Sequence, residues 1–146
     1  MSADSPAQPP VAAGRARPWR LQSQGYVAFF GGCVAVTTIA LINAARLGMP
    51  VKGRVLIACT GLAGLTLTLT LAMVLNPEVS IAAYTWLARG SAVVVHLVQA
   101  GVQKPYDRGT LLLSRGEEHA PMWLPGALAV LSGGLLEQAA LITLEE

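Results

Sequence analysis

Residues 55–75 read VLIACTGLAGLTLTLTLAMVL and contain no charged side chain. At about 1.5 Å of rise per helical residue, this stretch is long enough to cross the roughly 30 Å hydrocarbon core of a bilayer. The alternation of Leu and Thr over 65–71 would be typical of a β-strand in a soluble protein. A lone strand cannot pair its backbone polar groups in hydrocarbon, whereas a helix pairs them internally. We therefore predict a membrane-spanning helix.

Three further segments are similarly long and mostly apolar, and they cover residues 26–46, 79–103 and 122–143. Together with 55–75 they predict an all-α integral membrane bundle of four transmembrane helices over 26–146. The composition agrees, because 53% of the 146 residues are hydrophobic and only 12% are charged, with a mean hydropathy of +0.54. These values exclude a disordered chain or a disulfide framework, and they are too apolar for an ordinary soluble domain.

Polar segments separate the predicted spans. Residues 1–25 are rich in Pro and Ala and predict a disordered tail. Residues 46–54 predict a basic turn at the membrane surface, and Asn76, Pro77 and Glu78 predict a tight turn between the second and third spans. Residues 104–121 form the only substantial polar loop that the sequence predicts.

Four spans would place both termini on one side of the membrane. The two basic links carry Arg46, Lys52, Arg54, Lys104, Arg108 and Arg115, whereas the side with the termini carries Arg15, Arg17 and Arg20. Because Lys and Arg are enriched in cytoplasmic loops, we predict cytoplasmic links and termini that lie outside.

The sequence contains no recognisable catalytic or ligand-binding motif. It has no phosphate-binding loop, no HExxH, no GxSxG, no paired cysteines and no visible nucleophile–base pair, so we expect no enzymatic activity, no cofactor and no metal site. The formal net charge of +2 is spread thinly along the chain, which argues against a nucleic-acid partner. The expected partners are the lipid bilayer and, in addition, further copies of the chain or other membrane subunits.

Three titratable residues fall inside apolar spans: Arg89, His96 and Glu137. A charge at membrane depth is unfavourable unless it is paired or hydrated. In antiparallel helices, Arg89 and Glu137 would lie about 15 Å and 10 Å from the same membrane face, so we predict an Arg89–Glu137 ion pair. The alternative is a polar pathway in which Glu137 is an ion or proton site. His96 would lie too far from Glu137 for direct contact, and it is expected to hydrogen-bond between helices.

Small and hydroxylated residues of the second span predict a helix-packing seam. Thr66 and Thr70 lie one turn apart on one helical face, and Thr60 and Gly64 extend it. We interpret this seam as a surface for close helix contact, within the bundle or with a neighbouring subunit.

The residues FFGG at 29–32 and NAARLG at 43–48 resemble the start of a family of small bacterial multi-span membrane proteins with no assigned activity. The resemblance implies a bacterial cytoplasmic (inner) membrane location and no mechanism. The sequence thus predicts a structural or accessory membrane subunit with a buried Arg–Glu pair. The alternative is a small transporter or channel component that uses Glu137.

Overall fold

The protein was analysed as a computed structural model, which describes residues 17–74, 81–113 and 119–145. In these ranges the chain forms a short 3₁₀ helix, η1 (Leu21–Ser23), and four helices: α1 (Gln24–Arg46), α2 (Val51–Val74), α3 (Ile81–Leu113) and α4 (Trp123–Glu145). The described ranges contain no strand, which confirms the all-α prediction. The predicted tail over 1–16 and the predicted turn at 76–78 lie outside the described residues.

α2 confirms that the Leu–Thr alternation is helical. The hydroxyl of Thr68 donates to the Gly64 carbonyl at 2.9 Å, and that of Thr60 donates to the Leu56 carbonyl at 3.0 Å. Each hydroxyl is thus satisfied within its own helix, as is usual for Thr in an apolar helix. The period of two in the sequence therefore has no structural counterpart here.

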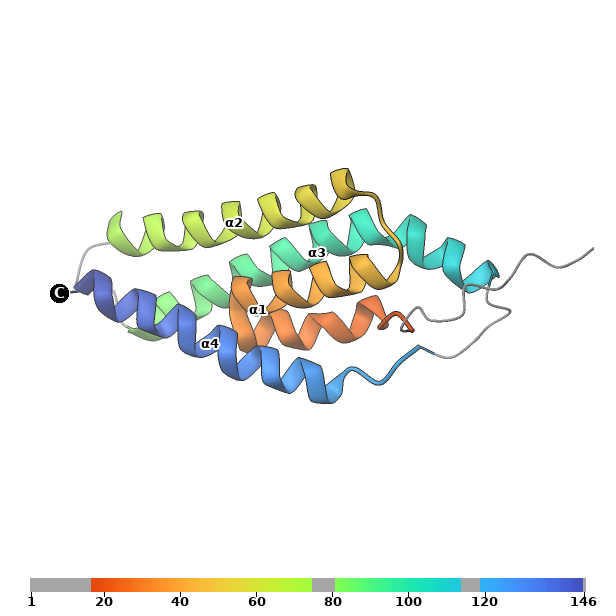
Figure 1. The fold of residues 1–146 in the computed structure, drawn as a ribbon. Helices are drawn as coiled ribbons and strands as arrows, with labels where there is room; N and C mark the ends of the chain where they lie inside the picture. The colour runs from red at the N-terminus through yellow and green to blue at the C-terminus, as the bar shows by residue number, and fades with distance from the viewer. Residues whose placement is uncertain (1–16, 75–80, 114–118, 146) are drawn as a thin grey trace, which may run out of the picture.

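α1 is a helical hairpin and not one straight helix. Gly32 has φ 73° and ψ −169°, a conformation that only glycine adopts readily, and it divides α1 into a first arm (24–31) and a second arm (33–46). A straight helix of 23 residues would be about 34 Å long. However, the backbone N–H of Trp19, just before η1, donates to Asn43 Oδ1 at 2.7 Å. The two arms therefore run antiparallel, with a tip at Gly31–Gly32 and a base where Trp19 meets Asn43 (Figure 1).

The hairpin corrects two predictions. Residues 26–46 are not a continuous span, because the arms rise only about 12 Å and 21 Å, each less than the roughly 30 Å bilayer core. Residues 17–25 are not disordered, because Trp19 is buried at the base. The Arg46 guanidinium lies 3.8 Å from the centroid of the Trp19 ring, and it donates to the Arg17 carbonyl at 3.0 Å.

The link from α1 to α2 ends the hairpin with a compact turn. Gly48, at φ 68°, donates its N–H to the Ala45 carbonyl, and Met49 donates to the Ala44 carbonyl. This pair of bonds is the Schellman arrangement, in which a left-handed glycine satisfies the last carbonyls of a helix. Met49 is fully buried against Ala44, and Pro50 precedes α2 directly.

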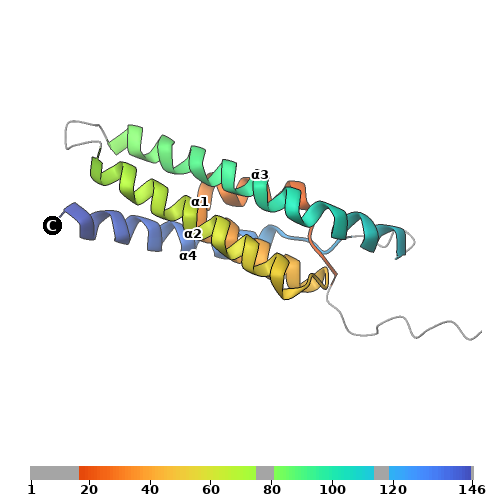
Figure 2. The same cartoon turned by 90° about the horizontal axis from the view of Figure 1, so that it is seen from above.

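α1 occupies the centre of the bundle. It contacts α2, α3 and α4, whereas α3 and α4 do not contact each other within the described residues. Figure 1 shows α3 and α4 on either side of the hairpin, and Figure 2 shows α2, α3 and α4 running along one common axis. The hairpin base, the start of α2 and the start of α4 lie at one end, which we call the base end. The end of α2, the start of α3 and the end of α4 lie at the other, the far end (Figure 1).

α3 is longer than predicted. It continues from Ile81 through Pro105 to Leu113, whereas we expected residues 104–113 to belong to a loop. Pro105 removes only one backbone hydrogen bond, that to the Gly101 carbonyl, and the turns on both sides stay helical. The added turns are tied down by Asp107, whose Oδ1 lies 3.3 Å from His119 Nε2.

The bundle exposes many large apolar side chains and buries several polar ones. Large apolar side chains of α2, α3 and α4 face outward, among them Leu62, Leu67, Val94, Leu97, Leu128 and Leu131. Several polar side chains are buried beside the apolar core: Gln24, Asn43, Thr68, His96, Gln99, Gln103 and Glu137. A soluble protein would expose the second group and bury the first.

By length and composition, two segments are apolar enough to cross a membrane, Leu21–Arg46 and Val51–Val74, and Trp123–Glu137 is a shorter apolar helix. The fold-back at Gly32 means that the first of these segments does not extend across the bundle. The prediction of four spanning helices is therefore not confirmed.

Candidate functional site

Glu137 lies at the tip of the hairpin. It comes from α4 and is 7% exposed. Its carboxylate is so close to Gly32 that a Cβ on that residue would overlap it, and the backbone N–H of Cys33 lies next to it. Cys33 begins the second arm, where free N–H groups and the helix dipole favour a negative charge. The carboxylate thus caps a helix that starts inside the bundle.

The predicted Arg89–Glu137 ion pair is wrong. The Arg89 guanidinium instead lies 5.3 Å from the ring centroid of Phe29 and 5.7 Å from that of Trp86, and it has no acidic partner in the described part of the chain. Residues at matching depth do not meet here, because the hairpin separates α3 from α4. The predicted pair was based on the similar membrane depths of Arg89 and Glu137, which bring two residues together only if their helices are in contact.

Three polar side chains of α3 face the hairpin: His96, Gln99 and Gln103. Their spacing of three and four residues places them on one helical face. Gln103 Oε1 accepts from Asn43 Nδ2 at 2.9 Å, at the base of the hairpin. Gln99 Nε2 donates to Thr37 Oγ1 at 3.0 Å, in the half of the second arm nearer the tip, and to the Ile57 carbonyl at 3.1 Å. His96 packs beside Gly25 of the first arm and is buried, but its Nδ1 has no partner among the described atoms, so the predicted interhelical hydrogen bond is not observed.

A small hydrogen-bonded group joins the tip of the hairpin to α3 and α2. The Cys33 thiol lies 3.8 Å from Ser91 Oγ, and Ser91 Oγ lies 2.7 Å from Thr68 Oγ1. With Glu137 beside the backbone of Cys33, each of the four helices contributes one polar residue at this level. The tip of the hairpin is therefore held by polar contacts as well as by packing.

Several buried polar atoms of this interior have no hydrogen-bond partner among the described protein atoms. They are Gln24 Nε2 and Oε1, His96 Nδ1, Gln99 Oε1, Gln103 Nε2 and Glu137 Oε1. Buried polar groups in proteins are almost always bonded, to protein or to ordered water. The unpaired atoms concentrate between the hairpin and α3, and at Glu137.

The packing seam of α2 is shifted from the predicted one. Gly64 lies against Val95 of α3 and Cys33, and Gly61 approaches Thr37 so closely that a Cβ would overlap it. Thr66 and Thr70 are exposed and face away from the bundle, so that part of the prediction is wrong. Thr60 is half-buried, and its hydroxyl bonds within α2. The residues that pack follow a heptad spacing: Ile57, Gly61, Gly64 and Thr68.

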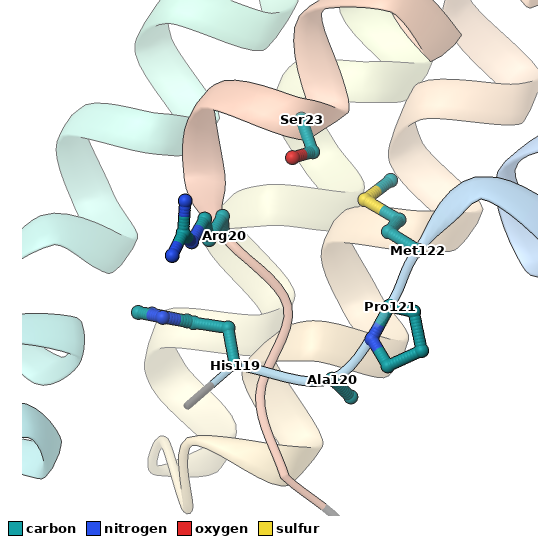
Figure 3. A pocket seen from close by; sticks show the side chains of 6 residues that line it. All are labelled: Arg20, Ser23, His119, Ala120, Pro121 and Met122. Atoms are coloured by element: carbon teal, nitrogen blue, oxygen red, sulfur yellow. The ribbon is translucent and has the colours of Figure 1, made fainter. Parts of the chain in front are cut away.

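A pocket of about 370 Å³ opens at the base end. Figure 3 shows its lining side chains, which come from the residues before α1 and before α4: Arg20, Ser23, His119, Ala120, Pro121 and Met122. Its lining residue Ser23 immediately precedes Gln24, the first residue of α1. The His119 ring contacts the Asp107 carboxylate in this region.

The sequence contained a signal for the α3 face that we did not use. His96, Gln99 and Gln103 are spaced like one face of a helix inside an apolar run, which indicates a shared polar neighbour. Among the residues that the structure describes, no group of three or more His, Cys, Asp or Glu side chains could hold a metal ion. Comparisons of this chain with protein-family models, with curated proteins and with solved structures found no match.

Proposed function

We propose that the protein is a multi-pass membrane protein in which α2, α3 and α4 cross the bilayer and α1 enters it as a re-entrant hairpin. The exposure of large apolar side chains supports this, because outward-facing leucines are stable in contact with hydrocarbon. The buried amides agree with it, because they are kept away from the lipid. The hairpin supports it as well. Irregular backbone at membrane depth is tolerated where protein surrounds it, and here it lies between α3 and α4.

The hairpin also changes the proposed orientation. Eight Lys and Arg residues are described, and all except Arg89 lie toward the base end: Arg17, Arg20, Arg46, Lys52, Arg54, Lys104 and Arg108. The positive-inside rule then places the base end in the cytoplasm, including the start of α1. The two ends of the described chain lie at opposite ends of the bundle, so this proposal places them on opposite sides of the membrane, unlike the arrangement predicted from the sequence. A bacterial cytoplasmic membrane fits this orientation.

We infer that the protein is a small transporter or channel component in which Glu137 exchanges a proton. One observation carries this proposal: a buried carboxylate with an unpaired oxygen lies at a break in a re-entrant helix. Ionisable groups and interrupted helices inside the membrane are characteristic of transport sites. A proton is favoured over a metal cation because, in the described structure, Glu137 belongs to no group of three or more His, Cys, Asp or Glu side chains that could hold a metal ion.

Proton flux into liposomes tests this proposal. Purified protein is reconstituted, a potential is imposed with potassium and valinomycin, and the internal pH is followed with a dye. We expect flux above that of protein-free vesicles, and loss of this flux in Glu137→Gln at unchanged reconstituted amount. Ser132→Ala is the matched control on α4, because that hydroxyl is exposed and bonds only within its own helix. Equal flux in wild type and Glu137→Gln, or no flux in wild type, would overturn the proposal.

The second candidate is a structural or accessory membrane subunit without enzymatic activity, which binds further copies of the chain or other membrane proteins. Close packing at the tip favours it: a Cβ at Gly31 would press on Val130 of α4, and one at Gly133 would press on the backbone of Ala35. In this role Glu137 only fixes the hairpin. Glu137→Gln would then lower thermal stability, and neither protein would conduct protons.

A further inference from the structure

The buried polar residues form a line that starts at the base of the hairpin and stops at its tip. Gln103 meets Asn43 at the base, Gln99 meets Thr37 along the second arm, and Ser91 meets Cys33 at the tip. Twelve residues of α3 separate Gln103 from Ser91, which corresponds to about 18 Å along the helix axis. The line therefore covers more than half of a bilayer core of about 30 Å.

The unpaired atoms lie along this line. The Gln103 and Gln99 amides each use one polar atom for a protein partner and leave the other unpaired. His96 Nδ1 and both amide atoms of Gln24 are also without a protein partner, and Glu137 Oε1 is the last unpaired atom, at the tip. All of these side chains are less than one-tenth exposed. Buried donors and acceptors in such a series are the usual partners of internal water, which makes about three hydrogen bonds per molecule.

The two ends of the line differ. At the base end, a pocket is lined by Arg20, His119 and Ser23, the residue that precedes Gln24 in the chain. Beyond the tip, toward the far end, none of the described buried polar atoms of the bundle is left unpaired. The second arm also starts at the tip and runs back to the base, so the hairpin contributes no backbone polar groups farther along.

We propose that a file of water molecules fills the space between the hairpin and α3, enters at the base end and stops at Glu137. This inference rests on the proposed function and adds that, in the conformation described here, Glu137 exchanges its proton with the base side, so net transport requires a second conformation that opens Glu137 to the far side. A proton that binds to the carboxylate comes from the last water of the file. In this conformation it returns by the same file when the carboxylate ionises again.

The two native cysteines provide a test with little disturbance of the protein. Cys33 is 1% exposed at the inner end of the line, whereas Cys59 is on the outer surface of α2, nearer the base end. Cys59→Ser leaves only the interior thiol, and Cys33→Ser leaves only the lipid-facing thiol. Ag⁺, which is about the size of a water molecule, is added to one side of oriented vesicles. Blocked thiols are then counted by maleimide labelling after denaturation.

We expect Ag⁺ added on the base side to block Cys33 at least about tenfold faster than it blocks Cys59. Ag⁺ added on the far side should block Cys33 at least about tenfold more slowly, because thiol reactivity follows access by water. The sidedness is calibrated with Lys52→Cys and Val74→Cys, which lie at the two ends of α2, in a background without native cysteines. Cys33→Ser is the matched control, since the Cys59 thiol that it leaves lies nearer the base end but outside the line of polar residues.

Equal blocking of Cys33 from both sides would show a path through the whole bundle, and absence of blocking from either side would show a dry interior. Either result overturns the one-sided file. The outcome of the proton-flux assay does not depend on the outcome of this test. Flux that depends on Glu137 together with an unreactive Cys33 would keep the proposed function and reject the file, whereas one-sided blocking without flux would keep the file and reject transport.

Discussion

Substituting Gly32 by Ala tests the hairpin by the sign of its effect. In a continuous helix, Gly→Ala stabilises by up to about 1 kcal/mol, because Ala has the higher helix propensity. In the structure, Gly32 has φ 73° and ψ −169°, and a Cβ there would overlap the Glu137 carboxylate. The same substitution should therefore destabilise this protein.

The magnitude has two parts. A non-glycine residue in this backbone region is strained by about 1–3 kcal/mol. Displacing a well-packed neighbour adds about 1–3 kcal/mol. The sum, roughly 2–6 kcal/mol, corresponds to a Tm lower by roughly 5–20 °C for a chain of this size. Glu137→Ala in the Gly32→Ala background removes the overlap and leaves the strain, so it should restore only part of the loss.

Thermal unfolding in a mild detergent, followed by circular dichroism or by fluorescence of the tryptophans, measures the shift. Gly90→Ala is the matched control, because a Cβ at that helical position meets no atom within 4 Å and should be neutral or slightly stabilising. A Gly32→Ala protein that is as stable as wild type, or more stable, would refute the hairpin and favour a continuous first helix.

Three other outcomes follow from the fold. Arg89→Leu and Glu137→Gln should change the free energy of unfolding additively within about 0.5 kcal/mol, since these residues do not touch; a coupling above about 1 kcal/mol would restore the ion pair. Spin labels at the exposed positions Gln22 and Ala45 should lie close together in a pulsed EPR measurement, whereas a straight helix would separate them by about 35 Å. Gly61→Leu should destabilise the bundle by about 1–3 kcal/mol because its side chain would meet Thr37, while Thr70→Ala, on the exposed side of α2, should stay within about 0.5 kcal/mol of wild type in the same unfolding assay.

The proposed orientation of the protein shows how topology changes the interpretation of charge. From the sequence, the basic residues divide six to three between the two sides, because 26–46 was counted as a crossing. Once α1 returns to its own side, Arg17 and Arg20 join the basic links at the base end. The same residues then give a consistent positive-inside pattern.

Helix type and position were accessible from local sequence. The uncharged run over 55–75 predicts α2 within a few residues, and the apolar run over 122–143 predicts α4. Both follow from the need to satisfy backbone groups in hydrocarbon, which depends on composition and length alone. The candidate residue Glu137 was also visible, because a carboxylate in an apolar run is unusual wherever it packs.

The neighbours of Glu137 were decided only by the tertiary structure. Gly31–Gly32 and Gly133–Gly134 are the same dipeptide in equally apolar runs, but the chain reverses at the first and stays helical through the second. Glycine permits both conformations at little energetic difference. The choice depends on the contacts that each one completes. Reversal at Gly32 lets Trp19 bond to Asn43, presents the Cys33 N–H to Glu137 and places the hairpin between α3 and α4. Those contacts join residues up to about a hundred positions apart, and a local sequence pattern carries no information about pairs at such separations.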